Sequence, residues 1–254
     1  MRIKSKVIAI VMAIAIFIGA GILGSIPAEG VPILAYHMVN DEDNHYSIST
    51  QDFETQMNYL KEQGYTPISL LEFAKARKGK FDLPAKPIII TFDDGYVDNY
   101  TNAVPIMEKY GMRGTIFIVV NEIGKKDYLS LEQLKDLEKR KIEIGSHTAN
   151  HLPLATLSME EKKSEIDKSK LLLEWKGLKT VFFMAYPNGS YDQEIEQMLE
   201  EGQYLGGCTG ETGYNTFDTN PYQLRRINIP QPYLGLTEFK LRFMRANLAA
   251  HLGW

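Results

Sequence analysis

The stretch that most constrains the fold is residues 87–96, with the sequence PIIITFDDGY. Its apolar, β-branched run shows no alternation with polar residues, which is typical of a strand buried on both faces of a parallel sheet. A buried carboxylate without a partner is costly, so we expect Asp93 and Asp94 to lie where this strand emerges from the core. Successive strand residues point to opposite sides, so the two acids need not share a partner. Enzymes with a parallel sheet place their chemistry at such strand ends, although Asp-Gly is also a common solvated turn.

Strand-like and helix-like patterns alternate along the rest of the chain without a linker or low-complexity break. The expected strands are residues 31–36, 65–68, 87–92, 114–120, 142–145, 180–185, 204–208 and 225–229. The expected helices are residues 50–63, 69–79, 99–110, 158–175, 192–201 and 237–252, with one more beginning at residue 130. This alternation predicts right-handed βαβ units and a parallel sheet. We expect a single distorted (β/α) barrel, with a doubly wound sheet as the alternative.

The first 28 residues differ in composition from the remainder, which we expect to form one domain over residues 29–254. Residues 1–6 (MRIKSK) are cationic, and residues 7–24 carry no charge. That run approaches the ~20 apolar residues that span a bilayer, and residues 25–28 offer only a weak cleavage pattern. We therefore expect a signal-anchor or a signal peptide, and a domain that works outside the membrane, either anchored to it or secreted.

Composition excludes two classes of function. The formal net charge is −4, and it becomes −7 without Arg2, Lys4 and Lys6 of the leader. A nucleic-acid-binding protein needs a basic face for phosphates, so we expect no nucleic-acid partner. Cys208 is the only cysteine, which excludes an intramolecular disulfide and a zinc–thiolate cluster.

Two of the five histidines follow another expected strand end. His147 and His151 are four residues apart in SHTANH, residues 146–151. One helical turn or a compact loop brings imidazoles at this spacing to the same point. Alone they could be solvated or core histidines, but they lie at a strand end equivalent to that of Asp93 and Asp94. Two imidazoles and one carboxylate make a metal site with open positions for water and substrate.

The motifs TFDDGY (residues 91–96) and SHTANH resemble the first two motifs of the polysaccharide deacetylases, the fourth carbohydrate-esterase family. The resemblance implies a distorted (β/α) barrel and a metal-dependent hydrolase that removes acetyl groups from sugar polymers. It also implies that Asp94, His147 and His151 bind one divalent ion, for which we expect zinc. Asp93 is then the catalytic base, which takes a proton as water attacks the acetyl carbonyl.

The third motif of the family is represented by AYPNG, residues 185–189. The resemblance implies that the backbone N–H at Asn188 helps to hold the developing oxyanion. Tyr186 is expected to line the sugar groove. Ala185 stands where the family usually carries an arginine that braces the base, and Arg225 and Arg226 are the candidate replacements.

The histidine general acid of many members is missing from the late segment LRRINIP, residues 224–230. An amide leaving group departs as an amine and needs a proton, so another residue must supply it. His37 lies in AYHMVND, which is similar to the N-terminal motif of the biofilm poly-N-acetylglucosamine deacetylases. We therefore expect His37 to be the acid. The alternative is a strand-end histidine that pairs with a local carboxylate such as Asp41.

These observations predict a metal-dependent N-deacetylase that acts on an extracellular N-acetylglucosamine polymer, with poly-β-1,6-N-acetylglucosamine favoured. A peptidoglycan N-acetylglucosamine deacetylase is the first alternative. The second is a catalytically silent carbohydrate-binding relative, for which the missing family arginine speaks and against which the complete set of Asp93 and metal ligands speaks. An acetylated polysaccharide is the expected partner, contact with the membrane is through the N-terminal segment, and we expect a monomer.

Overall fold

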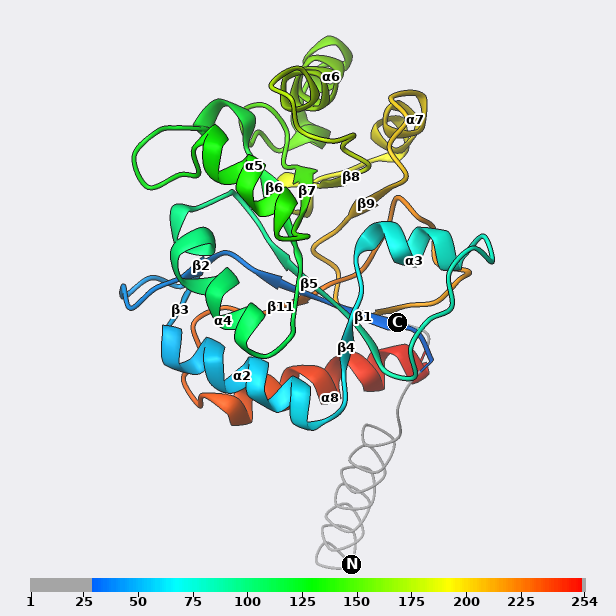
Figure 1. Ribbon diagram of the computed structural model, residues 1–254. Coiled ribbons are helices and arrows are strands. Elements are labelled where there is room, and N and C mark those ends of the chain that lie inside the picture. The colour runs from blue at the N-terminus through cyan, green and yellow to red at the C-terminus, as the bar shows by residue number, and fades with distance from the viewer. Residues whose placement is uncertain (1–28, 253–254) are drawn as a thin grey trace, which may run out of the picture.

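The computed structural model describes residues 29–252 and has a curled sheet at its centre (Figure 1). The strand order is β10, β1, β5, β6, β7, β8, β9. All neighbours along this path are parallel except β10, which is antiparallel to β1. The carboxyl ends of the parallel strands therefore meet at one edge. The strands are Tyr214–Asn215 (β10), Val31–Tyr36 (β1), Pro87–Phe92 (β5), Thr115–Ile118 (β6), Glu143–Ser146 (β7), Phe183–Ala185 (β8) and Gly206–Cys208 (β9).

The two ends of the curl are joined only by short pairings. Leu224 lies opposite Cys208 of β9, and Ile227 of β11 (Ile227–Asn228) lies opposite Leu34 of β1. The expectation of a distorted barrel is therefore met in part, since the sheet is curled and mixed and no full strand closes it. Three further short strands are β4 (Thr66–Pro67), which pairs with β5, and β2 (Met38–Val39) and β3 (Ser47–Ile48), which pair with each other.

Helices cover the outside of the curl. Figure 1 shows α2, α4 and α8 around the lower part of the curled sheet and α5, α6 and α7 around its upper part. Capping boxes begin α3, α5 and α6 at Ser69, Ser130 and Ser158, as the sequence predicts. The helices are Thr50–Glu62 (α2), Leu70–Ala76 (α3), Val104–Lys109 (α4), Leu131–Lys139 (α5), Met159–Trp175 (α6), Gln193–Glu201 (α7) and Leu236–Leu252 (α8). A π-helical turn, Asn99–Ala103, precedes α4, so the expected helix 99–110 is not α-helical throughout.

Alternate residues of the central strands enter two separate apolar clusters. Leu34 and Ile90 belong to the larger cluster, which lies between the sheet and the outer helices. Ile33 and Ile89 belong to a smaller inner cluster, which includes residues of α3. This double burial explains the unbroken apolar run of residues 87–92, because both faces of β5 are covered. The same alternation that turns Ile89 inward also turns Thr91 and Asp93 inward.

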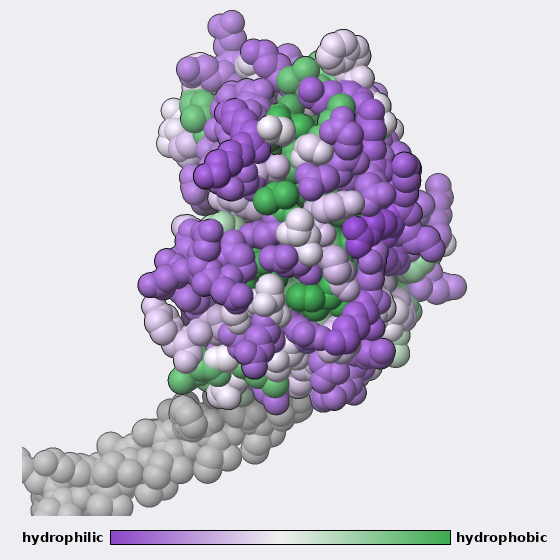
Figure 2. Space-filling view, turned by 60° about the vertical axis from the view of Figure 1, so that its left-hand side comes forward, coloured by the Kyte–Doolittle hydropathy of each residue, from purple (hydrophilic) through white to green (hydrophobic). Residues whose placement is uncertain are grey.

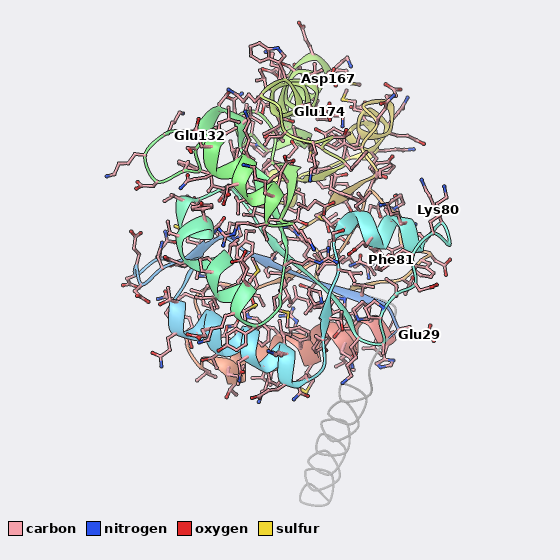
Figure 3. All side chains as sticks on the ribbon, in the orientation of Figure 1. Glu29, Lys80, Phe81, Glu132, Asp167 and Glu174 are labelled. Atoms are coloured by element: carbon pink, nitrogen blue, oxygen red, sulfur yellow. The ribbon has the colours of Figure 1, made fainter. Side chains whose placement is uncertain are left out.

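The surface is polar over most of the face seen in Figure 2, with small scattered hydrophobic areas. Glu132 on α5, labelled in Figure 3, is one of the exposed charged side chains on the outer helices. Within residues 29–252, no helix combines the length and the apolar character that crossing a membrane requires. The expected leader, residues 1–28, lies outside the described residues.

Candidate active site

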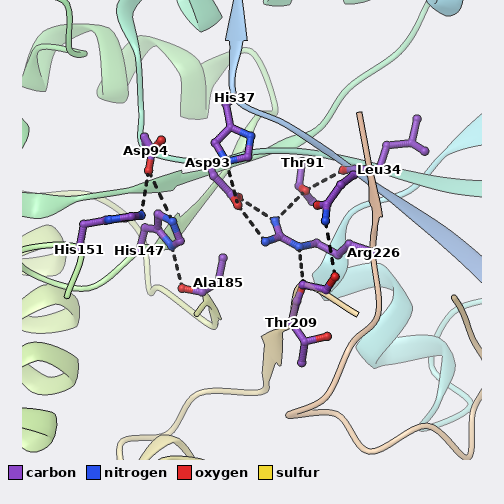
Figure 4. A network of polar contacts seen from close by, with 12 residues as sticks. Leu34, His37, Thr91, Asp93, Asp94, His147, His151, Ala185, Thr209 and Arg226 are labelled. Carbon is purple, nitrogen blue, oxygen red and sulfur yellow. Dashed lines mark hydrogen bonds and ion pairs between the residues drawn. The ribbon is translucent and has the colours of Figure 1, made fainter. Parts of the chain in front are cut away.

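Side chains from several strand ends line one cavity of about 810 Å³ at the carboxyl edge of the sheet. Arg226 enters this cavity from the segment just before β11. Figure 4 shows the polar contacts that connect the central side chains of the site. The other sequence-predicted residues follow four strands: His37 follows β1, Asp93 and Asp94 follow β5, His147 and His151 follow β7, and Tyr186 and Asn188 follow β8.

Asp94, His147 and His151 form a cluster whose ligand atoms lie within 4.8 Å of one another. Asp94 Oδ1 lies 3.5 Å from His147 Nε2 and 3.4 Å from His151 Nε2. Ligand atoms about 2.0–2.1 Å from a tetrahedral ion are about 3.3–3.4 Å apart, so both distances fit two edges of such a site. The three residues are therefore consistent with a divalent metal site, and ligands of this type suit several metals.

The loop after β7 brings the two imidazoles together without a helical turn. Thr148 and His151 both have positive φ angles, 66° and 59°, as does Asp94 with 74°. Such angles are uncommon outside glycine and are found where the surrounding structure enforces them, often at functional sites. Here the His151 N–H donates to Thr148 Oγ1 at 3.0 Å, and the Asn150 N–H donates to the Glu165 carboxylate at 2.8 Å.

His147 is fixed in the form that a metal ligand needs. Its Nδ1 lies 2.7 Å from the Ala185 carbonyl oxygen, which can only accept, so Nδ1 carries the proton. The lone pair of Nε2 is then free on the side of Asp94. Burial lowers the pKa of His147, which also favours the neutral imidazole. The backbone of residue 185 thus contributes to the site although its side chain is only a methyl group.

Asp93 is held by a buried arginine on the opposite side of the site from the cluster. Arg226 Nη1 and Nη2 donate to its two oxygens at 2.7 and 2.8 Å, and each residue is only 3% exposed. Burial alone would raise the pKa of Asp93, but Arg226, His147 and His37 outweigh it and hold the pKa well below its usual range. Asp93 is therefore ionised at neutral pH. Of the two candidates to replace the family arginine, the structure selects Arg226.

His37 lies on the other side of Asp93 from Arg226 (Figure 4). Its Nε2 is 4.0 Å from Asp93 Oδ2, and its side chain is 24% exposed to the cavity. No ion pair joins His37 to Asp41 among the described residues, so the alternative of a local carboxylate partner gains no support. Its general-acid role stays a prediction, but its place beside Asp93 is the one that the role requires.

The third motif places both Asn188 and Tyr186 at the cavity, but Tyr186 is almost fully buried. Asn188 lines the cavity in a short turn with φ 55° and ψ 18°, which leaves its oxyanion role a prediction. Tyr186 is only 1% exposed, its hydroxyl donates to the Tyr222 carbonyl at 2.8 Å, and its ring stacks on Tyr191. Tyr186 is thus at the wall of the cavity with little of its side chain exposed, and its role in binding the sugar stays a prediction.

A strand pattern in the sequence distinguishes Arg226 from Arg225. Ile227 and Ile229 are both buried in the outer cluster, so odd-numbered residues of this segment face the helices. Leu224 lies in the inner cluster, and Arg226 and Asn228 line the cavity. The alternation of Ile and Asn in residues 227–229 is therefore the sequence pattern that places Arg226 on the inner face. It covers too few residues to define the faces of a strand from sequence alone. Tyr46, Tyr96 and Arg242 also line the cavity and were not expected there.

Comparison with known proteins agrees with this geometry. Residues 80–206 match the model of the polysaccharide deacetylase family. The Bacillus subtilis protein YxkH is 35% identical over 203 residues, which cover 80% of this chain and 72% of YxkH. The poly-β-1,6-N-acetyl-D-glucosamine N-deacetylase of Staphylococcus aureus is 30% identical over 203 residues, covering 74% of this chain and 69% of the relative. The structure of the Streptococcus pyogenes deacetylase PplD in complex with acetate superimposes with a TM-score of 0.78 at 25% identity, covering 86% of this chain and 98% of PplD.

The chain therefore belongs to the polysaccharide deacetylase family, the fourth family of carbohydrate esterases, and is a polysaccharide N-deacetylase. The resemblance seen in TFDDGY and SHTANH is thereby confirmed. The carboxylate and the two imidazoles that these motifs bring together fit the divalent ion that this family uses.

Proposed function

We propose that this enzyme removes N-acetyl groups from an extracellular N-acetylglucosamine polymer, with poly-β-1,6-N-acetylglucosamine as the favoured substrate and zinc as the ion. The supporting observation is that Asp93, braced by Arg226, lies beside the Asp94 cluster in one open cavity. A carbohydrate-binding protein without activity has no use for a buried, ionised carboxylate next to a set of metal ligands. The loss of the family arginine no longer favours that alternative, because Arg226 makes the bidentate contact.

Each side chain of the site has a distinct task in this proposal. A divalent ion held by Asp94, His147 and His151 would supply a water of lowered pKa and polarise the acetyl carbonyl. Asp93 accepts the proton of the attacking water, and its carboxylate is ionised for this purpose because Arg226 stabilises the charged form. The backbone N–H of Asn188 donates to the acetyl oxygen as negative charge develops there.

His37 completes the reaction in this proposal. Collapse of the tetrahedral carbon breaks the bond to the sugar nitrogen, which leaves as a free amine only if it receives a proton. His37 Nε2 is 4.0 Å from Asp93 Oδ2, so the acid and the base face the same small volume. A histidine is suited to this task because its imidazole exchanges a proton near neutral pH.

The choice of polymer is supported by the Staphylococcus aureus relatives, whose names specify poly-β-1,6-N-acetyl-D-glucosamine. The cationic and apolar residues 1–24 support export, either membrane-anchored or secreted. We further propose that the enzyme acts as a monomer on a chain-like substrate that crosses the open cavity.

The test is acetate release from purified oligomers that differ only in linkage. We expect faster release from β-1,6-linked N-acetylglucosamine oligomers than from β-1,4-linked ones or from peptidoglycan. Chelation should abolish release, and zinc should restore it. Faster action on peptidoglycan would contradict the proposed substrate and support the alternative deacetylase. Absence of acetate release from every acetylated glycan would contradict the proposed reaction itself.

A further inference from the structure

A π-helical turn shortly after the TFDDGY motif holds the backbone at His37 and just after it. Asn99 Nδ2 donates to the His37 carbonyl at 2.7 Å, and Asn102 Nδ2 donates to the Val39 carbonyl at 2.8 Å. The carboxylate of Asp98, one residue before the turn, accepts from Asn40 Nδ2 at 2.6 Å. We refer to Asp98, Asn99 and Asn102 as the 98–102 clamp. The clamp thus contacts one short segment, residues 37–40: two of its side chains bind backbone carbonyls, and Asp98 binds the Asn40 side chain.

Asn99 is oriented entirely by these contacts. Its Nδ2 donates to Asp98 Oδ1 at 3.0 Å as well as to the His37 carbonyl, so both N–H groups have acceptors. The residue is 0% exposed, and its Oδ1 has no hydrogen-bond partner within residues 29–252. Burying an unpartnered amide oxygen costs free energy that an apolar side chain of the same size would not incur. The contact with the His37 backbone is the benefit that offsets this cost.

The position of the His37 imidazole in the cavity depends on the position of its backbone. Its distance of 4.0 Å from Asp93 is too long for a hydrogen bond, and its ring also contacts the Tyr46 ring, with centroids 5.0 Å apart. Neither contact fixes the direction of Nε2. The position of the ring in the cavity therefore depends on the position of the main chain around His37, which the clamp holds together with the hydrogen bond from the Met38 N–H to the Tyr46 carbonyl at 3.1 Å.

We propose that Asn99, with Asp98 and Asn102 beside it, is a positioning residue that fixes His37 opposite Asp93 for proton transfer to the leaving nitrogen. This inference rests on the proposed acid role of His37. In this proposal residues 93–102 contain the base, Asp93, and also fix the position of the acid, His37, which follows a different strand. π-helical turns inside helices are frequent at functional sites, and in this proposal the turn Asn99–Ala103 positions the backbone of His37.

The test is a double-mutant cycle between Asn99→Leu and His37→Ala, measured on an N-acetylglucosamine oligomer and on an activated aryl acetate. Leucine keeps the branching of the asparagine side chain at Cγ, although it is larger, and removes the donor. If the clamp acts through His37, Asn99→Leu alone should lower kcat on the amide by about 10- to 100-fold, part of the usual worth of a general acid. KM and bound metal should stay unchanged, and turnover of the ester, whose leaving group needs no proton, should fall less than about threefold. In the His37→Ala background, Asn99→Leu should have no further effect on the amide.

Thr101→Ala is the matched control, because Thr101 is exposed on the same turn and its hydroxyl donates to the Val97 carbonyl at 3.4 Å, away from residues 37–40. It should leave both substrates unaffected. Asn102→Leu, at a half-buried position, should reproduce the loss of amide turnover, and it replaces Asn99→Leu in the cycle if that variant does not fold. Equal losses on amide and ester, or losses that add to those of His37→Ala, would overturn the inference. A wild-type enzyme inactive on every acetylated glycan would instead contradict the proposed function.

Discussion

Asp93 and Asp94 are adjacent in the chain but contact different partners. The alternation of strand β5 turns Asp93 inward to Arg226, while Asp94 adopts a positive φ angle and faces the two imidazoles. One carboxylate is thus placed to accept a proton and the other to hold an ion. The side chains are chemically identical, so their surroundings alone separate the two roles.

Asp93→Asn tests the first of these roles. The amide keeps the shape of the side chain and can still accept a hydrogen bond from Arg226, but it cannot take a proton. We expect kcat to fall by about 10²–10⁴, the usual worth of general-base catalysis, while the bound metal stays at one ion per chain. The measurement is acetate release together with metal content after dialysis. Loss of the metal from this variant would mean that the roles of the two aspartates are exchanged.

His147→Ala tests the second role. The substitution removes a ligand atom that the Ala185 carbonyl orients, so we expect metal retention to collapse while the circular dichroism spectrum keeps its shape. His45→Ala is the matched control, because His45 lines the same cavity but lies outside the metal cluster. Unchanged metal content in His147→Ala would rule out the proposed ligand set.

Sequence reasoning could identify these residues because each motif follows a buried strand, whose end places it at the edge of the sheet. It could not decide between Arg225 and Arg226, since short β11 gives too weak a pattern to define its inner face. It could not show how deeply Tyr186 is buried, because exposure depends on contacts with residues distant in sequence, here the Tyr222 carbonyl that accepts from the Tyr186 hydroxyl.

At the scale of elements, local signals were the most reliable. The Ser-x-x-Glu and Ser-x-x-Gln capping boxes mark the starts of α3, α5 and α6, because the reciprocal hydrogen bonds need only residues of the first turn. The short strands β2, β3 and β10 were not expected, since two residues carry no periodicity. The π-helical turn was not expected either, because the hydrophobic residues of this segment follow a helical period and do not distinguish a π-turn from an α-helix.

Glu143 at the start of β7 connects two elements. Its carboxylate accepts from the N–H groups of Leu70 and Leu71 at the start of α3, at 3.1 and 3.2 Å, and from Thr115 Oγ1 at 2.9 Å. These bonds occupy N–H groups that a helix start leaves without partners inside the helix. Burial nevertheless raises the pKa of Glu143 to about 7.

This pKa predicts a pH-dependent stability. The folded state holds the Glu143 proton more tightly than the unfolded state, where the pKa is about 4.3, so the contribution of this group falls as pH rises from about 4.3 to about 7. In Glu143→Gln this slope should disappear. Urea unfolding at pH 5 and pH 8 should therefore show that the variant gains stability relative to the wild type at the higher pH. Glu160→Gln, at an exposed position in α6, should show no such relative gain. Parallel pH dependence of Glu143→Gln and wild type would contradict the prediction.

For the molecule as a whole, Arg226 connects the central strand β5, through Asp93, with β9 at one end of the curled sheet. Arg226 also donates through Nε to the Thr209 carbonyl at 3.0 Å, so it contacts the segments after β5 and β9 together. The segment 224–228 makes only short strand pairings, and this buried side chain contributes contacts that a full strand would make through its backbone.

Arg226→Met should accordingly destabilise the fold as well as the reaction. Removing one partner leaves Asp93 buried and unpaired, which typically costs about 3–5 kcal/mol. We expect a loss of this size in the free energy of unfolding, measured by urea denaturation, and a higher pKa for Asp93. Arg225→Met is the matched control, because Arg225 lies 3.7 Å from Glu211 in a pair whose side chains are 35% and 54% exposed, and pairs open to solvent contribute about 0–1 kcal/mol. Similar losses for both variants would show that the buried pair has no special place in the fold.

The Asp93–Arg226 contact spans 133 residues of sequence, whereas the metal ligands are complete by residue 151. A chain growing from its amino terminus therefore contains every ligand long before the guanidinium that stabilises the ionised base has been synthesised. Without that arginine, burial would favour the neutral form of Asp93, and a neutral carboxyl cannot accept a proton. The three residues of the metal cluster are therefore not sufficient for a working base, and the site is complete only when the segment that carries Arg226 joins the sheet.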